Sequence, residues 1–237
     1  MSGAQSWPSV RAVTFDAAGT LIEPRERVGE TYARVARRHG IEVEPMLAEH
    51  RFFELYRAAA PLCFPHLTRV GDILDAERQW WREIVRGVFA GFPTEQVDAA
   101  FEELFAYYGR GEAWNVFPDV RPALEALQSR GVLLGIVSNF DARLFRICEE
   151  LGLAGLFRTV AVSSRVGAAK PQAEIFRRAL HDLGVSPSEA LHVGDSWRED
   201  VCGAEAVGMR AVCIDRRSAP GERCIADLRV LPERLAI

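Results

Sequence analysis

The chain has 237 residues, of which 49% are hydrophobic and 26% are charged, and its formal net charge is −4. This composition is typical of a globular protein with one large domain or two smaller ones. The mild acidity argues against a nucleic-acid partner, and no apolar run approaches the ~18 residues of a membrane span. The amino-terminal residues lack the basic start and apolar stretch of a signal peptide. We therefore expect neither a nucleic-acid nor a membrane partner.

The cysteines and histidines set further limits. The five cysteines are widely spaced and include no CxxC pair, a pattern that favours a reducing cytoplasm over a disulfide framework. The five histidines lack the spacing of zinc ligands, so we expect no zinc site. Monomer and homodimer both stay open, because an aromatic-rich helical region can pack on itself or on a second copy.

The first predicted element is a strand over Arg11–Phe15, which ends at Asp16. Residues 23–112 then show helical periodicity and almost no strand signal. Amphipathic helices are predicted over Glu26–Arg38, Pro45–Ala59, Ala76–Phe89 and Thr94–Tyr108. Aromatic residues such as Tyr32 and Trp81 are expected mainly in the core between these helices. We therefore predict a helical-bundle cap domain at 23–112, inserted into a core domain made of residues 1–22 and 113–237.

The rest of the chain alternates short apolar runs with helical segments. Runs that are too short for helices and apolar throughout are typical of strands buried on both faces. Strands are predicted over Leu133–Val137, Thr159–Val162, Ala190–Val193 and Arg210–Ile214, and helices over Pro122–Ser129, Ala142–Leu151, Ala173–Leu183 and Asp200–Val207. A glycine closely follows each helix, as expected where a helix ends in a left-handed turn. The alternation predicts an α/β fold with a doubly wound parallel sheet.

Polar residues stand at the ends of three of these strands: Asp16, Ser138 and Asp195. Ligands of an open parallel sheet bind beyond the carboxyl ends of its strands, so these side chains are expected to converge there. Lys170, the only lysine of the chain, precedes a predicted helix and can join them as a compact positive charge. Carboxylates this close repel each other, and a hard cation such as Mg²⁺ is their natural neutraliser. The set predicts a site for phosphate and a divalent metal.

Four short motifs follow one another along the chain. They are FDAAGT at 15–20, IVSN at 136–139, KPQAEIF at 170–176 and GDSWRED at 194–200, the last continuing into GAEAVG at 203–208. With the position of the helical insertion, they resemble the haloacid dehalogenase-like hydrolase superfamily, in its form with a helical (C1) cap. The resemblance covers residues 11–22 and 113–215, which is the whole predicted core.

The resemblance implies a role for each motif residue. Asp16 would be the nucleophile and form an aspartyl intermediate. Mg²⁺ would be held by the carboxylates of Asp16 and Asp195 and the backbone carbonyl of Ala18, with Asp200 in support. The catalytic set would be Asp16, Ser138 and Lys170, and the phosphoryl oxygens would contact Gly19, Thr20, Ser138, Asn139 and Lys170.

Ala18 departs from the pattern of the superfamily's phosphatases. They have a second aspartate at this position, which protonates the leaving group. Alanine cannot move a proton, and general acid–base catalysis contributes about 10²–10⁴-fold in rate. A phosphatase with Ala18 would need a good leaving group, or an acid supplied by the substrate or the cap. His66, Glu23 and Glu30 are candidates for that acid.

Three other functions fit parts of the pattern. 2-Haloacid dehalogenases also lack the second aspartate and need no metal, because halide leaves without a proton; GDSxxxD, however, is similar to the metal-binding branch. Phosphonoacetaldehyde hydrolases also have alanine here but use a cap lysine, and residues 23–112 contain none. A protein that binds phosphate without turnover is the third. The motifs favour a Mg²⁺-dependent phosphatase that acts on a small organic phosphate between core and cap.

Overall fold

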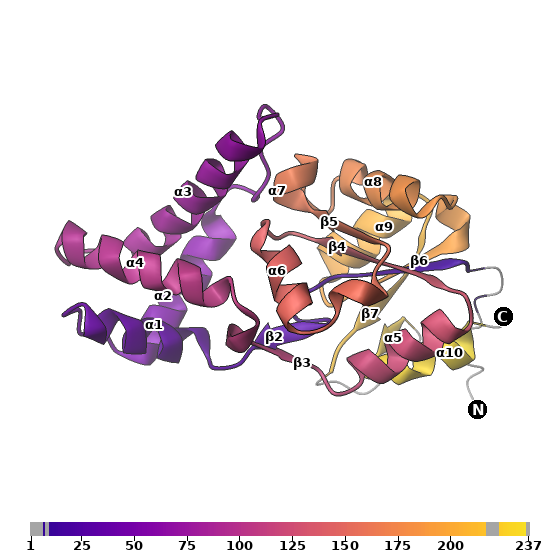
Figure 1. The fold of residues 1–237 in the computed structure, drawn as a ribbon, viewed down its shortest axis with the longest axis horizontal. Coiled ribbons are helices and arrows are strands. Elements are labelled where there is room, and N and C mark those ends of the chain that lie inside the picture. Colours follow the sequence, from indigo (N-terminus) through magenta and orange to yellow (C-terminus); the bar gives the residue numbers. More distant parts are fainter. Residues whose placement is uncertain (1–6, 8–9, 217–222, 236–237) are drawn as a thin grey trace.

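A six-stranded parallel sheet and a four-helix insertion lie side by side in the computed structural model, which describes residue 7 and residues 10–216 and 223–235 (Figure 1). The parts of the predicted core at 1–6, 8–9, 217–222 and 236–237 lie outside the described residues. The strand order is β5-β4-β1-β6-β7-β8. The strands are β1 Ala12–Phe15, β4 Leu133–Ser138, β5 Thr159–Val162, β6 Ala190–Gly194, β7 Arg210–Ile214 and β8 Cys224–Ile225.

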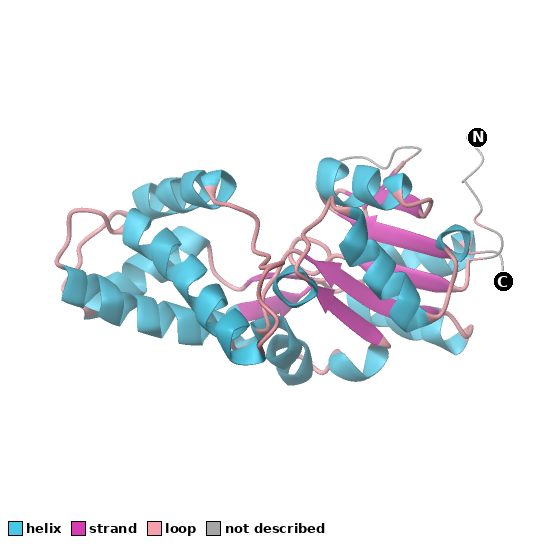
Figure 2. Ribbon diagram, turned by 90° about the horizontal axis from the view of Figure 1, so that it is seen from above, coloured by secondary structure: helices cyan, strands magenta, loops and turns pink. Residues whose placement is uncertain are grey.

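Helices cover both faces of this sheet (Figure 2). One face packs against α5 Val120–Ser129, α6 Arg143–Glu150 and α10 Leu231–Arg234. The other packs against α8 Ala173–Leu183 and α9 Gly203–Ala206, with α7 Ser163–Val166 beside them. All four side chains of β1 are buried, as expected for a central strand of a sheet covered on both sides. This arrangement confirms the predicted doubly wound α/β core.

The register of the sheet brings the ends of three central strands into line. Phe15 of β1 lies beside Ile136 of β4 and Val193 of β6. The residues that follow these positions therefore emerge at one edge, where the carboxyl ends of the strands meet. The sheet thus places the motif residues of separate strands next to one another.

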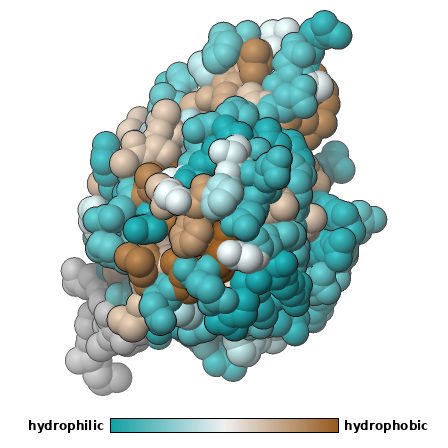
Figure 3. Space-filling model, turned by 90° about the vertical axis from the view of Figure 1, so that its left-hand side faces the viewer, coloured by the Kyte–Doolittle hydropathy of each residue, from teal (hydrophilic) through white to brown (hydrophobic). Residues whose placement is uncertain are grey.

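The helical insertion consists of α1 Val28–Arg38, α2 Pro45–Ala58, α3 Val70–Val88 and α4 Thr94–Tyr108. Its own apolar core includes Val35, Ile84 and Phe101. Hydrophilic side chains dominate the end of the molecule that it forms, with smaller apolar areas between them (Figure 3). The chain enters and leaves the insertion through an antiparallel pair, β2 Ile22–Pro24 and β3 Trp114–Val116. The two crossings are therefore hydrogen-bonded to each other.

Several boundaries differ from the predicted ones. Helix α3 begins at Val70 rather than at the predicted Ala76. The prediction starts too late because the apolar residues Val70 and Leu74 are exposed and interrupt the amphipathic pattern of the first turns. The predicted helix over Asp200–Val207 is instead a π-helical turn, Trp197–Cys202, followed by the short α9. Strands β2, β3 and β8 were not predicted, since two or three residues are too short to show a period.

Among the described residues, no helix combines the length and apolar composition that crossing a bilayer requires.

Candidate active site

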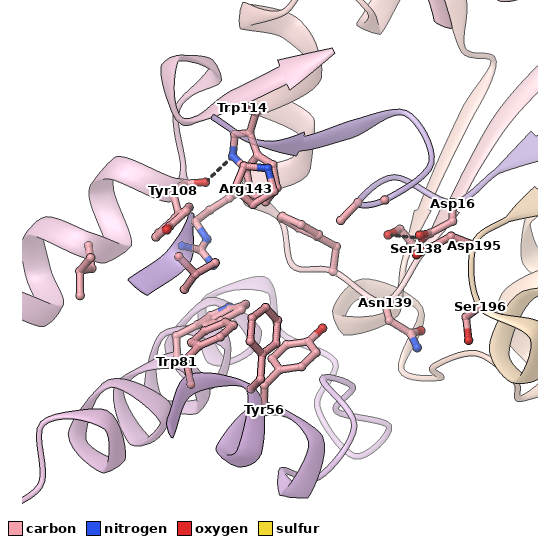
Figure 4. A pocket seen from close by; sticks show the side chains of 18 of the residues that line it. Asp16, Tyr56, Trp81, Tyr108, Trp114, Ser138, Asn139, Arg143, Asp195 and Ser196 are labelled. Atoms are coloured by element: carbon pink, nitrogen blue, oxygen red, sulfur yellow. Dashed lines mark hydrogen bonds between the residues drawn. The ribbon is translucent and has the colours of Figure 1, made fainter. Parts of the chain in front are cut away.

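The predicted polar residues meet at the carboxyl edge of the sheet (Figure 4). Asp16 directly follows β1, Ser138 is the last residue of β4, and Asp195 directly follows β6. Asp200 comes from the π-helical turn, and Lys170 from the loop before α8. All five line one cavity between the sheet and the helical insertion.

The Asp16 carboxylate is held by two donors on a single oxygen. Ser138 Oγ donates to Asp16 Oδ1 at 2.8 Å, and Lys170 Nζ donates to the same oxygen at 2.7 Å. Among the described residues, no donor bonds the second oxygen, Oδ2. The group is thus fixed through Oδ1 while Oδ2 is free to react. This is the geometry that a carboxylate nucleophile needs.

Lys170 links Asp16 to a second buried carboxylate. Its Nζ also donates to Asp200 Oδ1 at 2.6 Å. Burial alone would lower the pKa of Lys170, but the charges of Asp16 and Asp200 raise it above its ordinary value, so the ammonium stays charged. Asn139 fixes the Lys170 backbone, since its Oδ1 accepts from Lys170 N at 2.7 Å and its Nδ2 donates to Lys170 O at 3.1 Å.

A buried chain of hydrogen bonds behind the site was not found by sequence reasoning. His192 Nε2 lies 3.0 Å from Asp200 Oδ1, and His192 Nδ1 lies 2.8 Å from Thr14 Oγ1. An ionised carboxylate only accepts, so Nε2 is the donor to Asp200. Burial alone would raise the pKa of Asp200, but Lys170 and His192 hold it well below its ordinary value. The only sequence signal was a histidine inside an otherwise apolar strand.

The acidic residues fit a divalent cation. Asp16, Asp195 and Asp200 offer carboxylate oxygens that all lie within 4.8 Å of one another. When all three carboxylates are ionised, the single ammonium of Lys170 leaves an excess of two negative charges. Partial desolvation and the charges of Asp16 and Asp200 accordingly raise the pKa of Asp195 to about 7. Hard oxygen ligands with this excess charge suit Mg²⁺.

Gly19 leaves the room that Asp195 occupies. Its φ is +91°, in the region that favours glycine, and a Cβ at this position would meet Asp195 Oδ2 at 2.5 Å. Any larger residue would push the carboxylate aside. Gly19 therefore shapes the acidic cluster through its missing side chain.

The cavity has a volume of about 450 Å³ and two different sides. The sheet side is polar and contains Ser196 and Glu199 in addition to the residues above. Burial raises the pKa of Glu199, which accepts a hydrogen bond from Asn139 Nδ2 at 3.0 Å. The opposite side is mainly aromatic. It includes Phe53, Tyr56, Trp81, Phe105, Tyr108 and Trp114.

The structure brings most predicted site residues together, with some exceptions. Ala18, Gly19 and Asn139 line the cavity with the charged residues. Thr20 is fully buried and does not line it, so this geometry gives no support to a phosphate contact by its side chain. The candidate acids His66, Glu23 and Glu30 are also absent from its walls. Tyr32 and Trp81, expected in the helical core, reach the cavity as well.

Comparison with known proteins identifies the family of this chain. The family model described as "haloacid dehalogenase-like hydrolase" matches residues 10–208. The chain belongs to this family. Haloacid dehalogenase-like hydrolase domain-containing protein 3 of Mus musculus is 38% identical over 208 residues, which are 86% of this chain and 82% of the mouse protein. The Xenopus laevis protein of the same name is 32% identical over 90% of this chain and 87% of its own length.

Two solved structures of this family are equally similar to the chain. A HAD phosphatase from Thermococcus onnurineus is 28% identical, with a TM-score of 0.65 over 94% of this chain and 97% of that one. A 2-haloacid dehalogenase from Pseudomonas syringae pv. Tomato is also 28% identical, with a TM-score of 0.65 over 96% of this chain and 98% of that one. Overall likeness therefore does not separate the two activities, and the choice depends on the site.

Proposed function

We propose that this hydrolase is a Mg²⁺-dependent phosphatase that acts on a small organic phosphate through an aspartyl-phosphate intermediate. The observation that favours it is the position of Asp195. Asp195 completes a three-carboxylate cluster with Asp16 and Asp200, and a charge excess of this kind calls for a divalent cation. A dehalogenase does not require a divalent cation, because its halide leaves without a proton or a metal.

The roles of the side chains follow from their contacts. Asp16 Oδ2 attacks phosphorus, forming the O–P bond as the bond to the leaving-group oxygen breaks. Ser138 and Lys170 hold Oδ1, and the Lys170 ammonium offsets charge on the phosphoryl oxygens. Asp16, Asp195 and Asp200 would hold Mg²⁺, which supplies charge neutralisation when bound. Water then cleaves the aspartyl phosphate and releases inorganic phosphate.

Two assays test the proposal. Purified protein is given phosphate esters, acetyl phosphate and 2-chloropropionate, each with Mg²⁺ or with EDTA, and release of phosphate and chloride is measured. We expect phosphate release that EDTA abolishes. Asp16→Asn and Lys170→Ala should each remove it, whereas Asp72→Asn, an exposed change on α3, should not.

Other outcomes would point elsewhere. Chloride release insensitive to EDTA would make the protein a dehalogenase. If Asp16→Asn releases phosphate at the full rate, the assignment of Asp16 as the nucleophile is wrong. If neither phosphate nor chloride is released from any of these compounds, a protein that binds phosphate without turnover is favoured.

A further inference from the structure

We propose, resting on the function proposed above, that the substrate is an aryl phosphate whose aromatic group carries no charged substituent. Three features of the cavity support this class: the shape of its outer wall, the way its cations are used, and the absence of an acid at position 18.

The outer wall is the aromatic side of the cavity described above, and its rings already pack against one another. The ring of Tyr56 stacks against those of Trp81 and Phe52, with centroids 6.1 and 5.8 Å away and interplanar angles of 28° and 19°. Trp80 meets Tyr56 edge-on at 5.8 Å. Tyr56 and Trp81 lie across the cavity from Asp16 and Ser138 (Figure 4). A leaving group that departs from phosphorus away from Asp16 therefore moves toward aromatic rings, which an aromatic body can stack on.

Tyr108 adds to this wall and not to a polar site. Its hydroxyl oxygen is buried next to Thr31 and is not exposed to the cavity, and its ring packs edge-on against Trp114 at 6.1 Å. The wall thus offers mainly π surface to a ligand.

The cationic side chains that line the described part of the cavity are already paired with carboxylates, so neither is available to a second anionic group of a substrate. Of the described residues that line it, Lys170 and Arg143 are the cationic ones. Lys170 is bound to Asp16 and Asp200. Arg143 forms a fork with Asp141, with Nε–Oδ1 and Nη2–Oδ2 distances of 2.9 and 2.7 Å, and its Nη1 donates to Phe105 O at 3.1 Å.

Glu199 makes a second anion still less favourable, because its carboxyl group shares the same cavity. Desolvating an anion without a partner is costly. A substrate with a carboxylate or another phosphate on the leaving group therefore fits poorly, and the carboxylate of a 2-haloacid meets the same obstacle.

The chemistry at Ala18 agrees with an aryl ester. In the proposed step Asp16 Oδ2 bonds to phosphorus, the phosphorus–aryl oxygen bond breaks, and a phenolate leaves with the electron pair and later takes a proton from water. A phenol has a pKa of about 10, like tyrosine. Its anion can leave without the acid that alkoxide departure requires.

The test compares three probes in the presence of Mg²⁺: 2-naphthyl phosphate, 6-carboxy-2-naphthyl phosphate and acetyl phosphate. Acetyl phosphate has a good leaving group but no ring. We expect kcat/KM for 2-naphthyl phosphate to exceed that of its carboxylated analogue at least tenfold, and Glu199→Gln to narrow this gap.

Variants of the wall separate recognition from chemistry. Tyr56→Ala should lower kcat/KM for 2-naphthyl phosphate by about tenfold, as loss of one stacked ring predicts, and leave acetyl phosphate within about twofold. Phe53→Ala repeats the test at a second position; both side chains are 39% exposed, so neither change removes a buried core residue. Phe145→Ala, an exposed phenylalanine on α6 outside the cavity, is the matched control and should change neither rate.

The outcomes keep the two proposals apart. If acetyl phosphate is hydrolysed with Mg²⁺ but the carboxyl group has no effect, or if the wall variants slow both substrates equally, the aryl class is wrong and the phosphatase stands. If none of the three probes releases phosphate, both proposals fall.

Discussion

Ala18 is the residue at which this chain departs from the phosphatase pattern, and restoring an acid there is a direct test of what the departure costs. Ala18 lines the same cavity as Asp16. Ala18→Asp should raise kcat for cyclohexyl phosphate, a poor leaving group, by about tenfold or more, because a proton donor contributes up to about 10²–10⁴-fold. For 2-naphthyl phosphate the gain should be small, since a phenolate leaves unaided.

Ala18→Asn is the matched control for this prediction. It has nearly the same size as aspartate and a polar side chain, but it cannot transfer a proton. An equal gain from asparagine would mean that the effect is steric. No gain from aspartate would mean that an acid already acts elsewhere or that protonation does not limit turnover. Steady-state kinetics across a series of leaving groups decides between these outcomes.

Asp195 should make the proposed Mg²⁺ binding dependent on pH. Its pKa is raised to about 7 by partial desolvation and by Asp16 and Asp200, against about 3.9 in an unfolded chain. In the metal-free protein the protonated form therefore favours the folded state at low pH, and this contribution is lost as pH rises through about 7. Below about pH 7, Mg²⁺ must displace this proton, so its apparent affinity should fall by up to tenfold per pH unit.

Calorimetry at pH 6 and pH 8, each in two buffers of different ionisation enthalpy, measures both the affinity and the protons released. We expect close to one proton released at pH 6 and close to none at pH 8. Asp195→Asn should bind Mg²⁺ weakly and without this proton. Equal affinity at both pH values in the unmodified protein would contradict the shift.

At the scale of elements, the sequence predicts best those segments in which buried apolar residues recur with one regular spacing along the whole length. The strand β1 and the helix α4 lie almost where apolar periodicity places them. Strands β2 and β3 depend instead on pairing between Ile22 and Val116, far apart in the chain, and three residues contain no period that reveals this partner. Short elements are set by tertiary contacts and not by local pattern.

The same distinction holds within the site. Asp16, Ser138 and Asp195 are predictable, because the carboxyl ends of parallel strands must meet at one edge. His192 is not, because its role depends on a buried contact with Asp200 that only the folded register creates. The aromatic wall is also hidden in the sequence, since Tyr56 and Trp81 share the helical spacing of residues that fill a core.

The tight turn after β1 is an element whose conformation the site requires. Gly19→Ala should greatly weaken Mg²⁺ binding, because the new Cβ would meet Asp195 Oδ2 at 2.5 Å. Gly131→Ala is the matched control. Gly131 also has a positive φ, +78°, but a Cβ there meets nothing within 4 Å.

Both changes add a backbone strain of about 1 kcal/mol, so thermal unfolding of Gly131→Ala shows how much of the change in Gly19→Ala comes from strain alone. Only Gly19→Ala should lose metal affinity in calorimetry. Normal Mg²⁺ binding by Gly19→Ala would show that Asp195 is not held against the turn.

Over the whole molecule, buried polar contacts join the helical insertion to the sheet. Glu77 of α3 is 2% exposed and accepts from Ser164 Oγ at 2.6 Å and from Ala142 N at 3.2 Å. Trp81 Nε1 donates to Asp141 Oδ2 at 2.6 Å. These contacts, together with the β2–β3 pair, set the distance between the aromatic wall and Asp16. If the wall recognises the substrate as proposed, this recognition would depend on residues that do not touch the substrate.

Glu77→Ala tests this dependence, with Glu83→Ala as control because Glu83 is an exposed glutamate on the same helix. Removing Glu77 leaves the Ser164 hydroxyl and the Ala142 N–H buried without their acceptor, which should cost about 1–3 kcal/mol of unfolding free energy. Because the contact spans the two halves, we expect faster amide exchange in α3 and a raised KM for aryl phosphates, while kcat for acetyl phosphate changes little. If Glu77→Ala loses stability but keeps its exchange rates and KM, the contact supports folding alone and does not position the wall.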